Sequence, residues 1–479
     1  MPINSFLYPG AKVVPPYEVA NSCRFNDDDS AYMQKTPSSA SGRRTFTFSF
    51  WIKRGNISSV QTPFSAGNSS TEQIMRFEAG DTFYILDYQS SATKIEIRTS
   101  RVFRDPSSWY NIIIAVDTTQ GTASNRVKIY VNGVQETSFG TATYPDQNTD
   151  LMWNSDVLHA IGRKESGDNE YFDGYLAEVV NIDGSQLEPT SFGEFDSDSP
   201  NIWKPKDVSG LTFGTNGFYL DFEDSSNLGN DANGGTDFTE ANLAATDQST
   251  DTCTNNFATI SPIASQTRIQ TLSEGNLKAT YNSGSNGGTN WATIAATSGK
   301  WYAECFVNTM GYNGTNIGVL NVDSTAFPNS SSTALGQDNF SAGYYKTGIL
   351  YRNVETNHTG NTNDDFDSYD ANDIISIAMD LDNGFFYWAK NGTWQNSGDP
   401  TSAGTGTGGV ATSYLTANET YTFTAWIRNG SVISWNFGSP PSTFSISSGN
   451  ADANGFGNFE YSVPSGYFSL CTKNLAEFG

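Results

Sequence analysis

The sequence predicts an all-β protein that consists of two β-sandwich (jelly-roll) domains in tandem, and three observations support this fold class. Gly, Asn, Ser and Thr crowd between short apolar runs, and no long segment repeats apolar residues at a helical period. Aromatic residues make up 13% of the chain, with 31 Phe, 23 Tyr and 10 Trp. Short apolar runs closed by turn residues are typical of strands. A chain of 479 residues is long for one hydrophobic core, so we expect more than one domain.

The first part of the chain predicts a short arm followed by a sandwich. Residues 1–20 are rich in proline, which favours an extended arm over a folded element. From 21 to 195, strand patterns follow one another with no helix between them. In “TFTFSFWIKR” (45–54), every second residue from Phe46 to Ile52 is apolar, so these side chains share one face of a strand.

The rest of the chain predicts a bridging segment and a second sandwich. Residues 196–265 are rich in Pro, Asp, Asn and Gly, and we interpret them as a bridge that can return a strand to the first sandwich through “FYLDF” (218–222). From 266 to 479 the strand patterns resume. In “DIISIAMD” (373–380) one face of the strand is fully apolar and the other is mixed, which suits a sandwich.

Two segments share one pattern of apolar strand, Asp, turn, apolar strand and Asn-Gly. They are “IAMDLDNGFFYWAKNG” (377–392) and “IIIAVDTTQGTASNRVKIYVNG” (112–133). Asn-Gly accepts positive φ and closes tight hairpins, and the Asp that ends the first strand can accept hydrogen bonds from N–H groups of the turn. We therefore predict a central hairpin in each sandwich, with an architectural and not a catalytic role.

Composition excludes several classes of function. The chain has 51 Asp+Glu against 26 Lys+Arg, a net charge of −25, which would repel phosphate backbones and anionic lipid, so we expect no nucleic acid and no membrane partner. The first residues lack the basic and apolar regions of a signal peptide, and no apolar run is long enough to span a membrane. The only two histidines, His159 and His358, lie far apart, so a zinc site or a His-based triad is not expected.

The four cysteines have no metal-binding spacing and are too sparse for a disulfide scaffold. In “WYAECFV” (301–307), alternation places Cys305 on the same face as Trp301 and Ala303. We therefore predict that Cys305 is a small buried hydrophobic residue.

Residues 21–195 resemble the concanavalin A-like, laminin G-like jelly roll. The resemblance rests on stretches that follow the family's order and spacing: “FTFSFWIKR” (46–54), “WYNIIIAVD” (109–117), “VKIYVNGVQ” (127–135) and “YFDGYLAEVVNIDG” (171–184). About residues 275–470 resemble the SPRY (B30.2-like) sandwich, with long polar loops for that family. They do so through “SGKWYAECFV” (298–307), “NIGVL” (316–320), “AGYYKTGILYRN” (342–353), “DIISIAMDLDNGFFYWAKNGTW” (373–394) and “PSGYFSL” (464–470).

The pair of domains, with the ends “FLYPGAKVVPPYEV” and “GYFSLCTKNL”, resembles structural proteins of marine bacteriophages. This resemblance implies a non-enzymatic virion surface protein, such as a tail fibre, spike or capsid appendage, which is assembled in the host cytoplasm and exposed on the particle. Its implied partners are other virion proteins and a host-surface glycan or protein receptor. We also expect a homo-oligomer, such as a trimer, in which the arm (1–20) docks onto a neighbour. A purely structural decoration or fibre-base protein, and a polysaccharide depolymerase, are the alternatives.

Candidate ligand-binding residues come from rim loops, because sandwich lectins stack exposed aromatic rings on sugars and add Asp or Asn hydrogen bonds. The first domain offers Trp153, Asp168, Asn169 and Tyr171, and the second offers Tyr344, Tyr345, Tyr351, Arg352 and Trp394. Packing is the alternative for each aromatic side chain. Packing is the prediction for Trp51, Trp109, Trp301 and Trp388, which lie inside strand motifs.

We expect no catalytic residues and no cofactor. Glucanases of the laminarinase type carry E-x-D-x-x-E on one strand, and the nearest stretch is “GEFDSDSP” (193–200), with Glu194, Asp196 and Asp198. Its third acid comes one residue early, and Pro200 and the serines favour a connector. Calcium is an alternative at the acidic loops 26–30, 221–231 and 361–370, but none has the EF-hand register, and turn capping is the preferred interpretation there.

Overall fold

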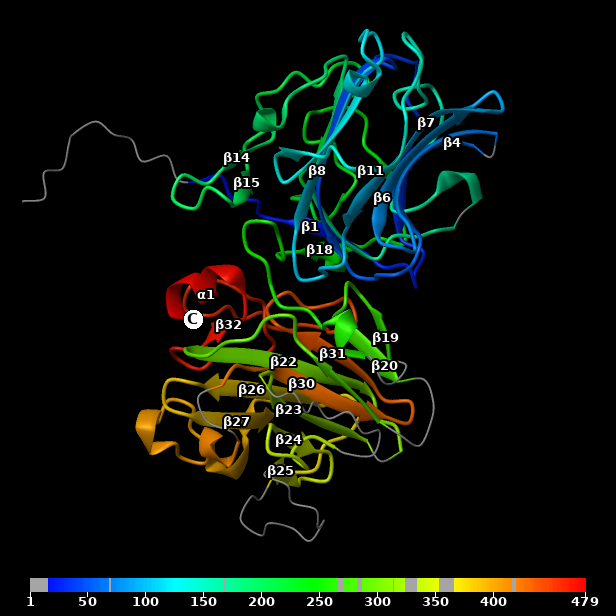
Figure 1. Cartoon of the computed structure of the whole chain (residues 1–479). Helices are drawn as coiled ribbons and strands as arrows, with labels where there is room; N and C mark the ends of the chain where they lie inside the picture. Colours follow the sequence, from blue (N-terminus) through cyan, green and yellow to red (C-terminus); the bar gives the residue numbers. More distant parts are fainter. Residues whose placement is uncertain are drawn as a thin grey trace, which may run out of the picture.

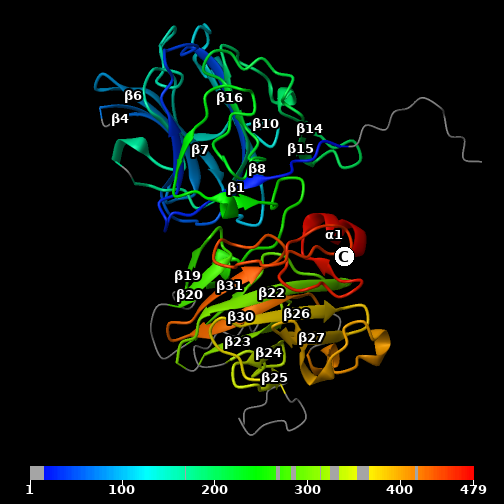
Figure 2. The ribbon, with the colours of Figure 1, turned by 180° about the vertical axis from the view of Figure 1, so that it is seen from behind.

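The structure, a computed structural model, describes residues 16–68, 70–167, 169–265, 270–281, 287–312, 314–323, 334–352, 366–415 and 419–479. It is nearly all-β, with 7% helix and 43% strand, which confirms the predicted fold class. Figures 1 and 2 show two bodies built from sheets and stacked on one another. Within the described residues, no helix combines the length and the apolar character that crossing a membrane requires.

The first sandwich is formed by two sheets, which we call sheet A and sheet B. Sheet A runs in the order β10 (Val134–Gln135), β9 (Val127–Val131), β8 (Tyr110–Asp117), β3 (Thr45–Arg54), β13 (Gly174–Asp183), β1 (Ser22–Phe25) and β18 (Gln248–Ser249), and β16 (Phe218–Leu220) pairs with β13. Sheet B runs in the order β11 (Phe139–Thr143), β7 (Ala92–Val102), β6 (Thr82–Gln89), β5 (Thr71–Phe77), β4 (Gln61–Asn68), β12 (His159–Ile161), β2 (Tyr32–Lys35) and β17 (Thr239–Ala241).

Strand β3 shows why the sequence forms this core. Phe46, Phe48, Phe50 and Ile52 are fully buried in the cluster between the two sheets, as the alternation predicts. Phe48 packs edge-on against Phe64 from sheet B, with 4.7 Å between ring centroids. Packing of this kind holds the two sheets face to face.

The segment that follows β13 covers the outer face of sheet A. It contains the hairpin of β14 (Gly193–Phe195) and β15 (Trp203–Pro205). Trp203 packs with Trp51, Trp109 and Tyr175 on that face, and further along, Phe213 stacks on Tyr219. The same segment supplies β16 and β18 to sheet A and β17 to sheet B.

The second sandwich also has two sheets. The larger runs in the order β19 (Gln270–Ser273), β20 (Lys278–Tyr281), β31 (Val432–Asn436), β22 (Lys300–Thr309), β26 (Ile374–Asp380), β27 (Phe385–Lys390) and β28 (Thr393–Trp394), with β29 (Val410–Ala411) paired to β27 and β32 (Phe468–Ser469) paired to β22. The smaller runs in the order β21 (Gly287–Trp291), β30 (Tyr421–Arg428), β23 (Thr315–Asn321), β24 (Ser341–Tyr345) and β25 (Leu350–Arg352).

Short helices complete the fold. The α-helix α1 (Thr472–Phe478) ends the chain. The 3-10 turns are η1 (Ala123–Asn125), η2 (Glu165–Gly167), η3 (Pro189–Ser191), η4 (Ala245–Asp247), η5 (Pro262–Ser265), η6 (Gln395–Ser397), η7 (Ala403–Thr405) and η8 (Thr412–Tyr414).

Packing predictions for single residues are confirmed. Cys305 is fully buried in the second core, and its thiol is free. The four tryptophans assigned to packing are all buried, namely Trp51, Trp109, Trp301 and Trp388.

The two predicted hairpins form and share their details. Asn132 and Gly133 have φ of 48° and 76°, and Asn391 and Gly392 have φ of 48° and 77°. The Asn132 side chain accepts a hydrogen bond of 2.8 Å from the backbone N–H of Asn111, and the Asn391 side chain accepts one of 2.8 Å from the backbone N–H of Ile374. Asp117 and Asp380 accept hydrogen bonds from backbone N–H groups of the following turn, at 3.0 and 2.9 Å. The predicted turn geometry is therefore confirmed.

A buried polar network joins the two sandwiches. The Lys53 ammonium donates to Asp251 Oδ2 at 2.7 Å, to Asn256 Oδ1 at 2.7 Å and to the Phe257 carbonyl at 2.9 Å. The Tyr175 hydroxyl donates to the Gly275 carbonyl at 3.0 Å. Figure 1 shows α1, at the end of the chain, beside this junction, where Lys473 pairs with Glu18. The beginning, middle and end of the described chain therefore meet at one place.

Candidate functional site

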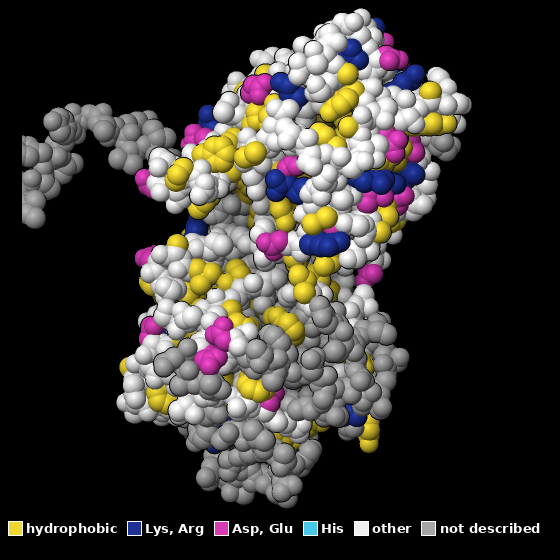
Figure 3. Space-filling view, in the orientation of Figure 1, with side chains coloured by type: hydrophobic (Ala, Val, Ile, Leu, Met, Phe, Trp, Pro, Cys, Tyr) yellow, Lys and Arg dark blue, Asp and Glu magenta, His cyan; other side chains and the backbone are white. Residues whose placement is uncertain are grey.

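The outer face of sheet B differs from that of sheet A, because its charged residues are partly exposed. In β7, Ile95 and Ile97 point into the core while Glu96 and Arg98 point outward. Strands β5 and β6 and the loop after β12 place further charged side chains, and the ring of Tyr84, on the same face. We call this set the charged face: Glu72, Arg76, Glu78, Tyr84, Glu96, Arg98, Lys164 and Glu170. Figure 3 shows basic and acidic side chains side by side over the region of β6 and β7.

Salt bridges link the charged face into a chain of alternating charge. Arg98 Nη2 lies 3.9 Å from Glu78 Oε2, and Glu78 Oε1 accepts a hydrogen bond of 2.7 Å from Arg76 Nε. Arg76 Nη1 then contacts Glu170 Oε2 at 3.2 Å, and Lys164 Nζ lies 3.9 Å from Glu170 Oε1. Lys164 also reaches Glu72 Oε2 at 3.7 Å. The result is a continuous row of donors and acceptors held in place by one another.

Arg76 lies at the centre of this row. Burial alone would lower the pKa of Arg76, but the hydrogen bonds and charges of Glu78 and Glu170 outweigh burial and raise it. Thr62 Oγ1 donates to Glu170 Oε2 at 2.7 Å, so the Glu170 carboxylate is fixed from two sides. The position of Arg76 is therefore set before any ligand arrives.

Tyr84 lies beneath two arginines. The guanidinium of Arg76 lies 5.1 Å and that of Arg98 lies 4.9 Å from the centroid of the Tyr84 ring. The Tyr84 hydroxyl donates to Glu96 Oε1 at 3.4 Å. Burial and the charge of Glu96 raise the pKa of Tyr84 to about 12. The ring is 6% exposed, so it supports the arginines and does not itself offer a stacking surface.

The loop after β12 frames one side of the charged face. Arg163 stacks over Tyr32, with 3.7 Å from its guanidinium carbon to the ring centroid, and donates to Gln34 Oε1 at 2.9 Å. Ser166 Oγ donates to Glu72 Oε2. Burial raises the pKa of Glu165, and the charge of Glu72 adds to this while Arg163 opposes it. The buried Oε2 of Glu165 accepts no hydrogen bond.

The candidates predicted for the first domain are not brought together. Trp153 lies in the loop before β12, but it is 1% exposed, belongs to the core and donates from Nε1 to Asn181 Oδ1 at 3.1 Å, so the prediction that it offers an exposed ring to a ligand is wrong. Asp168 lies outside the described residues. Asn169 is exposed and its carbonyl accepts from the Lys164 N–H at 3.0 Å, while Tyr171 is half-buried beside Tyr32, with 6.4 Å between ring centroids. Asn169 and Tyr171 therefore border the charged face.

The candidates predicted for the second domain are mostly packed. Tyr344 is fully buried, and its hydroxyl donates to the Asp367 carbonyl, so its predicted place on a rim loop is wrong as well. Tyr351 is 4% exposed and packs at 5.5 Å, centroid to centroid, against half-buried Tyr345. Arg352 is half-buried at the end of β25, and Trp394 is half-buried beside the cluster around Tyr387.

Two of the acidic segments singled out in the sequence, 193–200 and 221–231, cap turns, whereas in loop 26–30 the carboxylates of Asp27 and Asp29 accept hydrogen bonds from the side-chain amides of Asn56 and Asn26. Asp196 Oδ1 accepts from the N–H groups of Asp198 and Ser199 at 2.8 and 2.9 Å, and Asp196 Oδ2 lies 3.3 Å from Lys204 Nζ. In loop 221–231, Asp224 caps the N–H of Ser226 at 2.9 Å. Part of loop 361–370 lies outside the described residues. Among the residues that the structure does describe, no three His, Cys, Asp or Glu side chains converge as a metal cluster.

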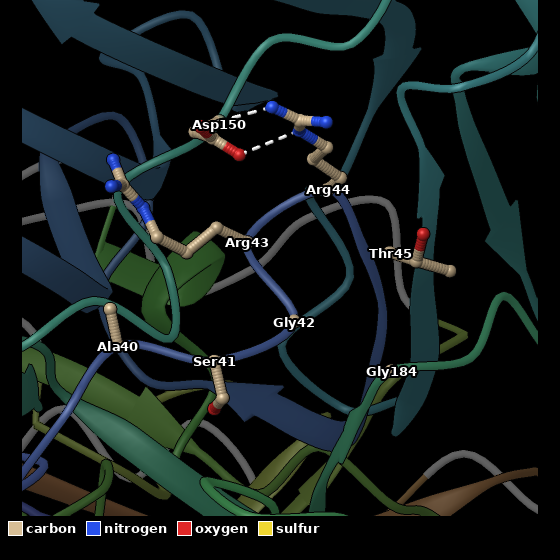
Figure 4. Close-up of a pocket in the computed structure, with 8 residues that line it drawn as sticks. All are labelled: Ala40, Ser41, Gly42, Arg43, Arg44, Thr45, Asp150 and Gly184. Carbon is tan, nitrogen blue, oxygen red and sulfur yellow. Dashed lines mark hydrogen bonds and ion pairs between the residues drawn. The ribbon is translucent and has the colours of Figure 1, made fainter.

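A hollow of about 430 Å³ at the rim of the first sandwich is a weaker candidate (Figure 4). Figure 4 shows Arg44 and Asp150 pointing toward one another, and two hydrogen bonds of 2.7 and 3.3 Å join them. Arg43 Nε donates to the Leu151 carbonyl at 2.6 Å, and Ser41 Oγ donates to Asp183 Oδ2 at 2.5 Å. Each of these four lining side chains, Arg44, Asp150, Arg43 and Ser41, is therefore bonded to the protein itself.

Residues 27–185, which lie in the first sandwich, match the family described as the concanavalin A-like lectin/glucanases superfamily. The match spans less than half of the chain. A comparison with curated proteins gave no match.

Three solved structures are similar to parts of the chain. The SPRY domain of human HERC1 is 16% identical, with 39% of this chain and 99% of that chain covered and a TM-score of 0.28. A candidate carbohydrate binding protein from Bacteroides ovatus is 20% identical, with 47% and 59% covered and a TM-score of 0.34. Domain 4 of the arabinanase AbnA from Geobacillus stearothermophilus, in complex with arabinotriose, is 17% identical, with 30% and 63% covered and a TM-score of 0.23. At these values none of the three carries an argument about function.

Sequence reasoning missed the charged face. The signal that could have found it is the strict alternation in “TKIEIRT” (93–99), which differs from “TFTFSFWIKR” (45–54) in having a charged residue at every second position. Such alternation is typical of a strand with one face in solvent. The partners from residues 163–171 could not be read from any pattern, because only the fold brings that loop over β4 and β5.

Proposed function

We propose that the protein binds glycans through the charged face of its first sandwich. The observation that carries the proposal is the row of alternating charge from Arg98 to Glu72, because it presents fixed donors and acceptors on an outward face of the sandwich. Sugars carry many hydroxyl groups that both donate and accept hydrogen bonds. A surface whose polar groups are already positioned loses little conformational entropy when such a ligand binds.

The chemistry of the face favours a polyhydroxylated ligand over a strongly charged one. Basic and acidic side chains alternate along the row, so no single sign of charge dominates the surface. Half-buried Tyr171, at the border of the face, offers an aromatic ring of the kind that packs on the apolar side of a sugar. The overall charge of −25 also disfavours a polyanionic glycan.

The test is binding of the full chain to a panel of neutral and acidic bacterial polysaccharides, measured by affinity electrophoresis. We expect Arg76→Ala to weaken binding by about tenfold or more, which corresponds to about 1.4 kcal/mol. The matched control is Arg44→Ala, which removes an exposed arginine of the same domain that is also paired with a carboxylate. The proposal would be contradicted if wild type binds and neither Arg76→Ala nor Arg44→Ala changes the affinity. It would also be contradicted if wild type binds no polysaccharide of the panel.

The finer proposal, a phage virion appendage that attaches to host-surface glycans or receptors, is supported only by the resemblance of the domain pair and the two ends of the chain. In this proposal the partners are other virion proteins and further copies of the same chain in a homo-oligomer. Antibody labelling of virions, combined with competition of adsorption by soluble protein, tests it. Labelling without competition would favour a decoration protein, and no labelling would contradict a place on the virion.

Glycoside hydrolysis is a second candidate, and one observation favours it. The Glu165 carboxyl, whose pKa is raised by burial and whose Oε2 accepts no hydrogen bond, lies close enough to Glu72 for the two charges to interact, and glycosidases use a pair of carboxyl groups that flank the scissile bond. If the protein shortens a polysaccharide and Glu165→Gln abolishes this activity without loss of binding, hydrolysis is the function. If wild type binds but leaves chain length unchanged, the protein is a binding protein.

A further inference from the structure

Two hollows, of about 460 and 230 Å³, lie where the two sandwiches meet. On one side both are lined by the segment around β18, and on the other by the connection from β31 to β32. Figure 1 shows β18 at the end of the first sandwich that faces the second. Thr250 lines both hollows, and Gly457 and Asn458, which are adjacent in the chain, line one each. The two hollows therefore form one elongated groove, which we call the junction groove.

Buried polar contacts hold the walls of the junction groove together. Arg24 is fully buried and donates to the Thr246 carbonyl at 2.7 Å on one wall and to the Pro440 carbonyl at 3.1 Å on the other. Ser249 Oγ lies 2.7 Å from Ser439 Oγ across the junction. The shape of the groove is therefore set before a ligand arrives, which lowers the entropic cost of binding.

The lining of the groove is polar but carries little charge. Among its described lining residues only Glu18 and Lys473 are charged, and these two pair with one another. No hydrogen bond joins the side chains of Asn21, Thr250 or Asn458 to another described residue. A hydroxyl and two amides, groups that both donate and accept hydrogen bonds, are therefore available to a ligand.

Phe456 gives the groove an aromatic ring. It lies between two glycines in “NGFGN” (454–458), is half-buried and belongs to none of the apolar clusters of the described chain. Its backbone N–H donates to Oδ1 of buried Asp452 at 3.0 Å, and the Asp452 N–H donates to the Phe456 carbonyl at 2.8 Å. Lys473 Nζ lies 5.5 Å from the ring centroid. The loop thus fixes an aromatic ring outside the core, beside unbonded polar groups.

We propose that the junction groove binds a neutral oligosaccharide, with one sugar ring against Phe456 and the next hydrogen-bonded to Thr250 and Asn458. The C–H face of a sugar packs on an aromatic ring, and its hydroxyls both donate and accept hydrogen bonds. An acidic sugar would bring a charge for which the lining holds no free partner. The site is separate from the charged face, and its ligand lies between the two sandwiches, so both contribute to binding.

The experiment is calorimetric titration of the full chain with cellotriose, maltotriose and laminaritriose, and with trigalacturonic acid as an acidic probe of similar size. We expect wild type to bind at least one of the neutral trisaccharides, and to bind the acidic one about tenfold more weakly or not at all. Absence of binding to all three neutral probes would overturn the proposal. Equal affinity for the acidic probe would overturn the assignment to a neutral ligand.

Two variants and one control locate the ligand. Phe456→Ala is expected to weaken binding by about tenfold, because it removes the ring, and Thr250→Val by about fivefold, because it removes one hydrogen-bonding group. Thr250 is exposed, so Thr250→Val serves if Phe456→Ala does not fold. The matched control is Tyr312→Ala, which removes an 80% exposed aromatic ring of the second sandwich that does not line the groove, and it is expected to bind as wild type does.

The outcomes also separate this site from the charged face. Binding that is the same in wild type, Phe456→Ala and Thr250→Val would overturn the proposal, because the sugar would then bind elsewhere. If Arg76→Ala loses that binding, the trisaccharide occupies the charged face, and the proposed function stands while the junction groove is not its site.

Discussion

The two outer faces of the first sandwich differ in what lies over them. The outer face of sheet A is covered by the bridging segment, and β13 is buried at all ten of its positions. The outer face of sheet B carries the charged face, and β7 alternates between buried core residues and more exposed ones over its central positions. The two faces therefore differ in whether a charged side chain is accessible. On sheet A it is part of the interior, and on sheet B it is available to a ligand.

One ion pair from each face shows this difference in exposure. The Lys53 and Asp251 side chains are 1% and 2% exposed and lie 2.7 Å apart. The Arg98 and Glu78 side chains are 39% and 19% exposed and lie 3.9 Å apart. A buried pair cannot lose one member without leaving an unpaired charge in the interior, whereas water replaces a lost partner at the surface.

The largest expected effect comes from breaking the buried pair. Lys53→Ala leaves Asp251 buried without its cation and removes the donor to Asn256 and the Phe257 carbonyl. We expect a loss of about 3–5 kcal/mol in the free energy of unfolding, measured by urea denaturation. A loss below about 1 kcal/mol would show that water reaches the junction and that the outer face of sheet A is not closed.

A pH dependence is expected next, and it also belongs to sheet A. Glu178 accepts hydrogen bonds from the hydroxyls of Tyr17 and Tyr219, and burial raises the pKa of Glu178 to about 8 from an ordinary value of 4.5. Between pH 4.5 and about 8, the Glu178 carboxyl therefore keeps its proton in the folded protein and loses it in the unfolded chain. The free energy of unfolding that Glu178 contributes then falls as the pH rises from about 5 to 8, by about 1.4 kcal/mol per pH unit.

The measurement is urea unfolding at several pH values for wild type and Glu178→Gln. Burial raises the pKa of Glu304, in the second domain, to about 7, so wild type has a contribution of the same sign from there. The difference in the free energy of unfolding between wild type and Glu178→Gln isolates the contribution of Glu178. As the pH rises, wild type should lose stability relative to Glu178→Gln. A difference that does not change with pH would show that Glu178 is ionised in the folded protein.

A smaller effect is expected where Tyr175 joins the two sandwiches. Tyr175→Phe removes the hydrogen bond to the Gly275 carbonyl and leaves that buried acceptor without this donor. We expect a loss of about 1 kcal/mol, with both sandwiches still unfolding in one transition. Calorimetry checks this, and the appearance of two separate transitions would mean that the junction depends on this one contact.

The smallest effect on stability is expected from the charged face. Arg98→Ala removes a side chain that is 39% exposed and whose salt bridge to Glu78 is long. We expect a loss below about 1 kcal/mol in the free energy of unfolding, measured under the same conditions as Lys53→Ala. A loss as large as that of Lys53→Ala would contradict the distinction between a structural and an available face.

Local patterns predicted much of the fold, because their physical causes are local. The alternation in β3 requires only that one face be buried, and Phe48 and Phe50 lie where it places them. The left-handed φ of Asn132 and Asn391 follows from the turn chemistry of Asn-Gly. The core position of Cys305 follows from its neighbours on the same strand.

Candidate site residues were harder to predict, because the sequence does not say which loops reach the surface. Trp153 and Tyr344 have the composition of ligand-stacking residues, yet they are 1% and 0% exposed. Their polar atoms bond to Asn181 and to the Asp367 carbonyl, partners that are distant in the sequence. An aromatic residue near a turn can face either way, and tertiary packing decides.

The sequence by itself determined the all-β class, the central hairpins and the faces of the core strands, because each depends on residues close together in the chain. Only the tertiary structure decided that the segment after β13 closes the outer face of sheet A, that Lys53 finds its partners about 200 residues away, and that Thr250 and Phe456 line one groove. The physical reason is that burial and charge pairing depend on distance in space, and three-dimensional packing sets that distance.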